Sequence, residues 1–313
     1  MNQVYKYLGY SKQAFHQKMN RKLKQREEQL LLLPIIEQLR EDHPGAAAKQ
    51  LYSILKPEDI GRDKFERLCF DHGFKLERPR AFKRTTDSTG VIRFPNLIAG
   101  IEFTSINQAW SSDITYYQIG ENFYYLTFVL DLYSRTIVGF NVSQRLSTDQ
   151  TTIPALKMAL SVRNPEPGLI FHSDAGGQYY CKTFLKLTAE YKIKNSMCEV
   201  VYENAHAERI NGTIKNQYLK GYNPENFESL VKKTAKAVYN YNCVRPHKSL
   251  NNIPPAAFEQ LLPAGGSSLT NDNFCGSYNP SQQQRKNNHL PTRQKSSNEH
   301  VKRIKKTVNV FQA

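Results

Sequence analysis

The pattern of apolar residues changes abruptly at Ala109. Three runs beyond that point, 110–119, 123–133 and 136–145, are rich in Tyr, Thr, Val, Ile and Phe. Runs of β-branched and aromatic residues between tight turns are typical of β-strands. Because only a few residues separate these runs, they can pair as antiparallel neighbours, and the sequence predicts a three-stranded meander.

The chain then alternates between helical and strand-like patterns. We expect a helix over 149–163, a short apolar strand over 169–172, a helix over 178–191 and a strand near 196–201. This order adds parallel strands to the meander, so the predicted fold class is α/β, with a mixed sheet flanked by helices. Two long helical patterns follow, at 205–219 and 226–241.

The first 90 residues have a helical period instead. Helices are expected over 5–18, with Ser11 placed to cap a second short helix, and over 21–41, interrupted at Pro34. Two shorter helices, 46–55 and 62–72, flank a turn, which is the arrangement that places a second helix in a DNA major groove. Lys64 and Arg67 would make the groove contacts. A plain helical bundle would leave the same pattern.

The charge of the chain favours a polyanionic partner. The 43 Lys and Arg residues exceed the 28 Asp and Glu residues, which gives a net charge of +15. Residues 1–90 and 263–313 each carry +6 of it. Such an excess is typical of nucleic-acid binding, although a basic protein without such a partner would show it too.

Composition divides the chain into four parts. They are a basic helical region that is a candidate for DNA binding (1–90), a linker (91–104), an α/β core (105–262) and a basic, mostly disordered tail (263–313). The chain has no membrane-spanning apolar run and no export signal near Met1, so we expect a cytoplasmic protein. Its five cysteines are scattered and form no CxxC pair, which argues against a disulfide framework or a zinc module.

Three carboxylates occupy unusual positions. Asp113 lies inside the first predicted strand, where aspartate is disfavoured. Asp174 directly follows the fourth strand and precedes two glycines that permit close approach of backbone and ligand. Glu208 lies in the first turns of a helix. Taken singly, the two aspartates could be a bulge residue and a turn residue.

Glu208 belongs to a polar helix face that also carries Asn204, Asn211 and Lys215, spaced by three or four residues. Such a face could hold a metal ion and a phosphate together. An ordinary solvated helix face has the same pattern. Glu203, five residues before Glu208, would point about 140° away from it on a regular helix.

The three acids and their flanking words resemble the DDE transposase and retroviral-integrase superfamily. The resemblance is closest to the catalytic subunit encoded by the second reading frame of two-frame bacterial insertion sequences. It covers about residues 105–258. The words that carry it are Trp110…Asp113-Ile114-Thr115-Tyr116, Leu130-Asp131-Leu132-Tyr133-Ser134-Arg135, His172-Ser173-Asp174-Ala175-Gly176-Gly177-Gln178-Tyr179, Asn204-Ala205…Glu208 and Tyr239-Asn240-Tyr241-Asn242…Arg245-Pro246-His247.

This resemblance implies an RNase H-like fold and a transesterification on DNA, with Asp113, Asp174 and Glu208 as catalytic residues and metal ligands. Oxygen ligands without a Cys/His set select Mg²⁺ or Mn²⁺. Two such ions, roughly 3.5–4 Å apart, would activate the attacking oxygen and stabilise the leaving 3′-oxygen. Lys215 would hold the terminal phosphate or an end base. Arg209, Arg245 and His247 are further expected DNA contacts.

The expected partners are the double-stranded DNA of the element's ends and of the target. A homo-oligomer on DNA and an upstream-frame helix-turn-helix protein are also expected. Two other functions share the fold: a nuclease that cuts without joining strands, and a DNA-binding protein without catalysis. The basic flanks favour transposition over the first, and the three intact acids argue against the second.

Some positions depart from the family pattern or lack a catalytic role. The Asp174–Glu208 interval is about two residues short, Glu203 replaces an aspartate, and Gln217 stands where a second glutamate is common. His172 is interpreted as a structural strand-end residue. Asp131 is assigned to the turn that follows it and to the integrity of the sheet.

Overall fold

A computed structural model describes residues 7, 9, 11–58, 60–76, 94–174, 176–198 and 204–262 of the 313-residue chain. The predicted tail (263–313), most of the basic connector before the core and Glu203 lie outside the described residues. The four-part division of the chain therefore stays a prediction. Within the described residues, no helix is long and apolar enough to cross a membrane.

The N-terminal region begins with two helices, α2 (Lys12–Leu31) and α3 (Leu33–Asp42). Ser11 caps α2, since its side chain accepts a hydrogen bond from the Ala14 amide at 3.1 Å. The predicted break between a helix over 5–18 and another over 21–41 is wrong, because α2 runs through it. The interruption falls at Leu32, and Pro34 lies in the first turn of α3, where a missing N–H costs nothing.

The helix-turn-helix pattern appears as α4 (Ala48–Leu55) and α5 (Arg62–Asp71), close to the predicted bounds. These helices pack with α3 around a small apolar core of their own, made by Ile36, Ala46, Ala48, Leu51, Ile60, Phe65, Leu68 and Cys69. Lys64 and Arg67 lie on α5 and are both exposed. The helix predicted to contact DNA thus leaves both cations within reach of solvent.

The predicted meander consists of β1 (Ala109–Ile119), β2 (Asn122–Asp131) and β3 (Ile137–Ser143), which pair antiparallel. Two short strands, β4 (Ile170–Ser173) and β5 (Lys194–Met197), add to it in parallel. The five-stranded sheet has the order β3-β2-β1-β4-β5, so β1 pairs with β2 on one side and β4 on the other. The prediction of a mixed sheet is confirmed, although β5 lies earlier in the chain than expected.

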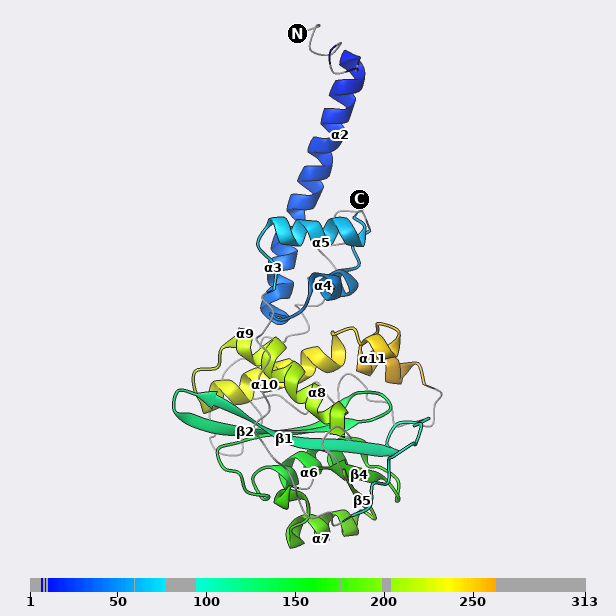
Figure 1. Cartoon of the computed structure of the whole chain (residues 1–313), viewed down its shortest axis with the longest axis vertical. Helices are drawn as coiled ribbons and strands as arrows, with labels where there is room; N and C mark the ends of the chain where they lie inside the picture. The colour runs from blue at the N-terminus through cyan, green and yellow to red at the C-terminus, as the bar shows by residue number, and fades with distance from the viewer. Residues whose placement is uncertain are drawn as a thin grey trace, which may run out of the picture. The chain divides into compact units, whose positions relative to one another are not determined.

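Helices cover both faces of this sheet (Figure 1). One face carries α6 (Thr152–Arg163) and α7 (Lys182–Glu190), and the other carries α8 (Ala205–Thr213) and α10 (Phe227–Cys243). A short helix, α11 (Pro255–Gln260), which was not predicted, packs against α10. The main core lies between the sheet and α6 and α7; its largest members are Trp110, Leu156, Leu160, Phe171, Tyr179 and Phe184. This RNase H-like arrangement confirms the predicted fold class.

A close approach of α6 to β3 depends on a glycine. A Cβ atom at Gly139 would collide with the backbone oxygen of Ala155 and come within 2.9 Å of the Ala159 side chain. Any larger residue would push the helix off the sheet. Gly139 therefore allows α6 to seal this part of the core.

Two buried charged groups hold the edge of the core. Asp131 accepts hydrogen bonds from the amides of Tyr133 and Ser134 through Oδ1 and from the Asn107 amide through Oδ2. This is the turn-forming role predicted for it. The buried Arg163 donates to Glu259 Oε1 at 2.6 Å and so ties α6 to α11.

The helix predicted over 205–219 is divided into three parts. It begins as α8, continues as a π-helix, η3 (Ile214–Leu219), and ends as α9 (Lys220–Tyr222). A π-helical turn adds a residue per turn and rotates the side chains that follow it. The predicted regular helix is therefore interrupted after Thr213, although Lys215 still lies against β1 through its bond to Thr115.

The loop that follows α3 packs against η3. The Gly45 amide donates to the backbone oxygen of Gln217 at 2.8 Å, and a Cβ atom on Gly45 would collide with that residue. His43 is 2% exposed, and its Nδ1 lies 3.2 Å from the Tyr218 hydroxyl. Gln217, which stands where a second glutamate is common, thus meets the N-terminal region through its backbone.

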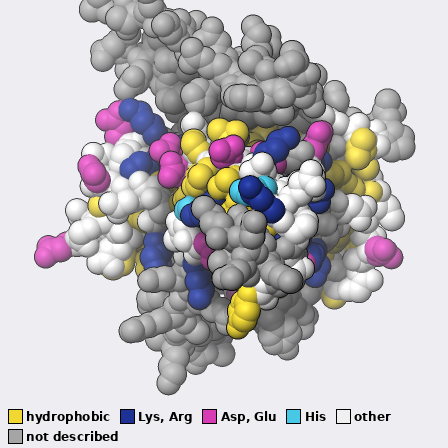
Figure 2. Space-filling model, turned by 90° about the horizontal axis from the view of Figure 1, so that it is seen from above, with side chains coloured by type: hydrophobic (Ala, Val, Ile, Leu, Met, Phe, Trp, Pro, Cys, Tyr) yellow, Lys and Arg dark blue, Asp and Glu magenta, His cyan; other side chains and the backbone are white. Residues whose placement is uncertain are grey.

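Basic and acidic side chains are interspersed on the face of the molecule seen in Figure 2. No continuous field of one sign covers the described atoms of this view. The described part of this face is therefore not a uniformly basic surface.

The burial of His43 predicts a pH-dependent stability. Burial, the largest effect, acts with the charges of Arg245 and Lys236 to lower the pKa of His43 to about 4, against the opposing charge of Asp42. An unfolded histidine has a pKa of about 6.5, so the unfolded chain binds more protons between about pH 6.5 and 4. The free energy of unfolding should fall as the pH falls through this window, by up to about 3 kcal/mol from His43 alone.

Denaturant melts of the full chain at several pH values would test this. The variant His43→Gln, which keeps a polar partner for Tyr218, should lose the share of the pH dependence that His43 contributes. His206 and His247, whose pKa values are also lowered to about 4 by burial, should keep theirs. His72→Gln, at an exposed position, is the matched control. Parallel pH profiles for the wild type and His43→Gln would contradict the prediction.

Candidate active site

Two of the predicted acids lie side by side because of how β1 pairs with β4. The parallel register ends at the pair Ser112 and Ser173. Asp113 and Asp174 are the next residues along the chain from this pair. Neighbouring strands lie about 4.8 Å apart, so both carboxylates leave the backbone close together at the carboxyl end of β4.

A tight turn follows Asp174. The Gly176 amide donates to Asp174 Oδ1 at 3.1 Å. A Cβ atom at position 176 would lie 2.9 Å from that same oxygen, which is closer than side chains pack. The glycine predicted to permit close approach therefore allows the turn to hold the carboxylate in place.

The third acid, Glu208, comes from α8, which is fastened to β1 by two asparagines. Asn204 accepts from the Ser111 hydroxyl at 3.0 Å and donates to the Ser112 carbonyl at 3.1 Å. Asn211 donates to Asp113 Oδ2 at 2.8 Å. Glu208 lies one helical turn from each asparagine, on the same side of α8. The solvated-face interpretation of this helix is wrong, because both asparagines are buried against the sheet.

The electrostatics of Asp113 show that the three acids lie close enough to interact. Burial, the largest effect, acts with the charges of Asp174 and Glu208 to raise the pKa of Asp113 to about 7, against hydrogen bonds from Ile114 and Asn211. Burial also raises the pKa of Asp174. As placed, no three His, Cys, Asp or Glu side chains of the described residues stand close enough to hold one metal ion.

Lys215 lies beside these acids on η3. Its Nζ donates to the Thr115 hydroxyl at 3.0 Å and stands 4.7 Å from the centre of the Tyr116 ring. Burial lowers the pKa of Lys215, while the charge of Asp113 raises it. The sequence argument placed Lys215 near the acids but found neither its threonine nor its aromatic neighbour.

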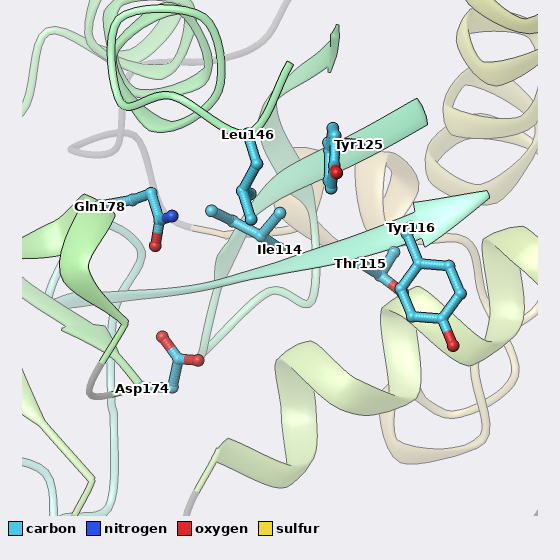
Figure 3. A pocket seen from close by; sticks show the side chains of 7 residues that line it. All are labelled: Ile114, Thr115, Tyr116, Tyr125, Leu146, Asp174 and Gln178. Atoms are coloured by element: carbon cyan, nitrogen blue, oxygen red, sulfur yellow. The ribbon is translucent and has the colours of Figure 1, made fainter. Parts of the chain in front are cut away.

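A pocket of about 200 Å³ opens next to Asp174. Figure 3 shows Asp174 and Gln178 on one side of it, with Ile114 and Leu146 facing them. Thr115, Tyr116 and Tyr125 complete the lining. Leu146 and Tyr125 were missed by the sequence argument, because neither lies in a motif that carries polar chemistry.

A buried tyrosine lies beneath the residues that precede the two aspartates. The hydroxyl of Tyr179 lies 2.9 Å from that of Ser112, and its pKa is raised well above the ordinary value by burial and by the charges of Asp174 and Asp113. His172, on the strand between β1 and β5, is fully buried with Nδ1 2.9 Å from the Ser196 hydroxyl. It bonds a neighbouring strand, in keeping with the structural role predicted for it.

The predicted DNA contacts fall into two groups. Arg209 lies on α8, and Arg245 and His247 follow α10. Burial lowers the pKa of His247 to about 4, and the charges of Arg135, Arg245 and Arg209 contribute to this shift. Lys64 and Arg67 lie on α5, in the N-terminal helical region and not on the core.

Comparison with known proteins identifies the core. An integrase core domain model matches residues 104–202, and a second model of the same description matches residues 190–255. A protein of insertion element IS600 from Shigella sonnei, described as an uncharacterized 31 kDa protein, is 34% identical over 206 residues, which is 64% of this chain and 75% of that protein. A putative transposase of IS986/IS6110 from Mycobacterium tuberculosis is 30% identical over 224 residues, covering 68% of this chain and 80% of that one.

A transposase from Escherichia coli, InsF of insertion sequence IS3A, is 34% identical over 160 residues, covering 49% of this chain and 54% of that protein. Among solved structures, the HTLV-2 integrase catalytic core domain in complex with magnesium is 23% identical over 49% of this chain and 95% of that one, with a TM-score of 0.41. The simian T-cell lymphotropic virus intasome gives 17% identity, 72% and 78% coverage, and a TM-score of 0.45.

The resemblance carried by the acids and their flanking words is confirmed by these matches. Two curated relatives reach 30% identity or more over at least three quarters of their own length, and the integrase core models fall on the sheet and α8. The chain belongs to the insertion-sequence transposases that carry an integrase core domain.

Proposed function

We propose that the protein catalyses metal-dependent cleavage and strand transfer at the ends of a mobile element, with Asp113, Asp174 and Glu208 as its catalytic residues. The observation that carries this proposal is the placement of the three carboxylates. Asp113 and Asp174 follow directly on the last residue pair of β1 and β4, and Glu208 lies on α8 between two asparagines that bond to β1. Burying like charges together is unfavourable unless a cation or a proton compensates them. A fold that brings them together with several hydrogen bonds therefore supports a cation site.

The donor set fits a hard divalent ion. Carboxylate oxygens without cysteine or histidine in the group suit Mg²⁺ or Mn²⁺, and Asp113 has no ion-pair partner among the described residues. When bound, a pair of such ions would supply Lewis-acid activation of the attacking oxygen and stabilisation of the leaving 3′-oxygen. Asp113, Asp174 and Glu208 would hold them.

The surrounding residues of the chain orient these ligands. Asn211 fixes the Asp113 carboxylate through Oδ2, and the Gly176 amide fixes that of Asp174 through Oδ1. Asn204 holds the start of α8, and hence Glu208, against β1. Lys215, held over the Tyr116 ring, is placed to bind a DNA phosphate or end base beside the acids. Prior orientation of this kind removes the cost of arranging ligands during the reaction.

The proposed reaction is a hydrolysis followed by a transesterification. Water first attacks the phosphodiester at the element's end and breaks its bond to the 3′-oxygen, which leaves a 3′-hydroxyl on the element and a 5′-phosphate on the flanking strand. The 3′-hydroxyl then attacks a phosphodiester of the target, forms a new phosphodiester and displaces the 3′-hydroxyl of the target strand. We expect the protein to act as a homo-oligomer on DNA, together with an upstream-frame helix-turn-helix protein. The relatives named as insertion-sequence transposases support a transposase function over that of a nuclease that does not join strands.

Neutralising any one of the three acids should abolish chemistry but spare DNA binding. Asp113→Asn, Asp174→Asn and Glu208→Gln should each lower cleavage and strand joining about a thousandfold or more. Asn211→Ala, which removes a donor to Asp113 but no ligand, should lower them only about 10- to 100-fold. The measurement is cleavage and joining of labelled element-end DNA with Mg²⁺, beside a binding assay without metal.

Glu203→Gln is the matched control for Glu208→Gln, because it removes the same charge five residues away. It should be mild. An inactive Glu203→Gln with an active Glu208→Gln would show that the third ligand is assigned to the wrong residue. Cleavage without any joined product, in the wild type, would favour the nuclease alternative.

Binding to DNA phosphates should depend mainly on the basic flanks, which carry +12 of the net +15. Deleting residues 263–313 removes eight basic and two acidic residues. The slope of log affinity against log salt should flatten by about 0.9 for each phosphate that the shortened chain fails to neutralise. Cleavage chemistry at saturating DNA should not change, since the three acids are retained.

Lys64 and Arg67 should instead govern discrimination between element ends and other DNA. Salt titrations with end and scrambled duplexes would compare the full chain, the tail deletion and a Lys64/Arg67 double substitution. An unchanged slope after the deletion would refute the role of the tail. Equally weakened binding to both duplexes after the double substitution would reduce α5 to a non-specific phosphate contact.

A further inference from the structure

The pocket beside Asp174 lies along β1 beyond the point where β4 ends. The pairing of β1 with β4 stops at Ser112, whereas β1 continues to Ile119. The residues of β1 that line the pocket, 114–116, therefore have no strand beside them on the β4 side within the described part of the chain. The short length of β4 thus leaves room for a cavity directly next to a proposed catalytic acid.

The walls of this pocket are largely apolar or aromatic. Figure 3 shows Ile114 and Leu146 facing the side that carries Gln178. Tyr116 and Tyr125 are cross-strand partners on β1 and β2, so their side chains leave the same face of the sheet. Leu146 is 48% exposed and Tyr116 is 58% exposed. Exposed apolar and aromatic groups around a small cavity favour a flat ligand with an apolar face.

Gln178 gives the pocket a group that can recognise hydrogen bonds. Its backbone is fixed, because its carbonyl accepts from the Thr152 hydroxyl at 3.2 Å and its neighbour Tyr179 is buried. Its side-chain amide makes no hydrogen bond to another described residue. A Cβ atom on Gly176 would lie 3.3 Å from Gln178 Oε1 and 2.9 Å from Asp174 Oδ1. The amide therefore stands close to the acid, with its donor and its acceptor both available to a ligand.

A cation lies near the other end of the pocket. Thr115 and Tyr116 line that end, and Lys215 Nζ contacts both, with a hydrogen bond of 3.0 Å to the threonine and 4.7 Å to the centre of the tyrosine ring. The pocket thus extends between Asp174 and Lys215. A DNA strand whose phosphates meet a metal ion at Asp174 and the ammonium group of Lys215 would cross the mouth of the pocket.

The volume of the pocket limits what it can hold. About 200 Å³ is less than the roughly 300–1,000 Å³ of pockets that enclose drug-sized ligands. A base pair would not fit, whereas a single ring system would. Sites for a base that has left its stack combine apolar or aromatic walls with a group that bonds to the edge of the base, and this pocket has both features.

We propose that this pocket binds one unpaired nucleobase of the element's end, next to the phosphodiester that is cut, and that Gln178 recognises its edge. The base would lie between Leu146 and the two tyrosines. An amide both donates and accepts, so it can distinguish bases by the pattern of donors and acceptors on their edges. This inference rests on the proposed function, which places the cut at Asp174, and it adds a residue that selects the base found there.

The fluorescence of 2-aminopurine would detect the unpaired base. The full chain, without metal, is mixed with element-end duplexes that carry this adenine analogue at one position at a time around the cleavage point. Its fluorescence rises when it leaves the base stack, so one position should brighten severalfold on binding. Leu146→Trp, which fills the pocket, should abolish this rise. Leu261→Trp makes the same substitution at an exposed leucine after α11, and as the matched control it should keep the rise.

A mismatch at the responding position gives a second measurement. Unpairing costs less for a mismatched base, so the mismatch should tighten binding of the wild type about tenfold and leave that of Leu146→Trp unchanged. Both tryptophan variants should melt at the wild-type temperature, because each changes a side chain that is at least 48% exposed. Brightening at no position, or equal responses of Leu146→Trp and Leu261→Trp, would overturn the proposal.

Gln178→Leu separates recognition of the base from its capture. The variant keeps the length of the side chain but removes the amide, so the rise in fluorescence should persist. The preference among four duplexes that differ only at the responding position should fall about tenfold. Gln260→Leu, at an exposed position at the end of α11, is the matched control and should keep the preference. A preference unchanged by Gln178→Leu would refute the role of this residue.

These measurements involve no cleavage, so they are independent of the tests of the three acids. Failure to find a responding position would leave the predictions for the acids untouched. If the acid variants kept full activity instead, a responding position that Leu146→Trp abolishes would still stand.

Discussion

The parallel pairing of β1 with β4 is the constraint on which the active site depends. The pairing stops after Ser112 and Ser173, and the chain places an aspartate directly after each of these serines. Carboxylates set so close would repel each other and lose hydration, and the raised pKa of Asp113 reflects both effects. Trp110 and Phe171 lie on the paired part of these strands, in the apolar core. The free energy of folding that this core contributes offsets the cost of the close carboxylates.

The helix that delivers the third acid is held by amide side chains and not by apolar packing alone. Asn204 and Asn211 bond to β1 on either side of Glu208, and one of them bonds Asp113 itself. Directional bonds of this kind fix both the rotation of α8 and its position along β1. An apolar contact would tolerate a sliding helix, and a sliding helix would move Glu208 relative to the strands.

Local patterns predicted the meander, the order of strands and helices, and the three acids, because each of these leaves a signal within a few residues. The role of Asn204 could not be predicted in this way, since its partners lie more than 90 residues earlier. The same holds for Asn242, which joins α10 to β3 through bonds to Ile137, 105 residues earlier. The π-helix after Thr213 also left no local signal, because the sequence there keeps a regular helical period.

Helix α8 carries Glu208 on the side that Asn204 and Asn211 hold against β1. Asn211 also orients Asp113, whose pKa is raised by burial first and then by the charges of Asp174 and Glu208. Gathering like charges in a partly buried place is costly for the free protein. Under the proposed function, divalent cations bound together with DNA would offset this repulsion. Substrate binding would then relieve electrostatic strain at the helix that positions Glu208, which would couple binding to the order of the active site.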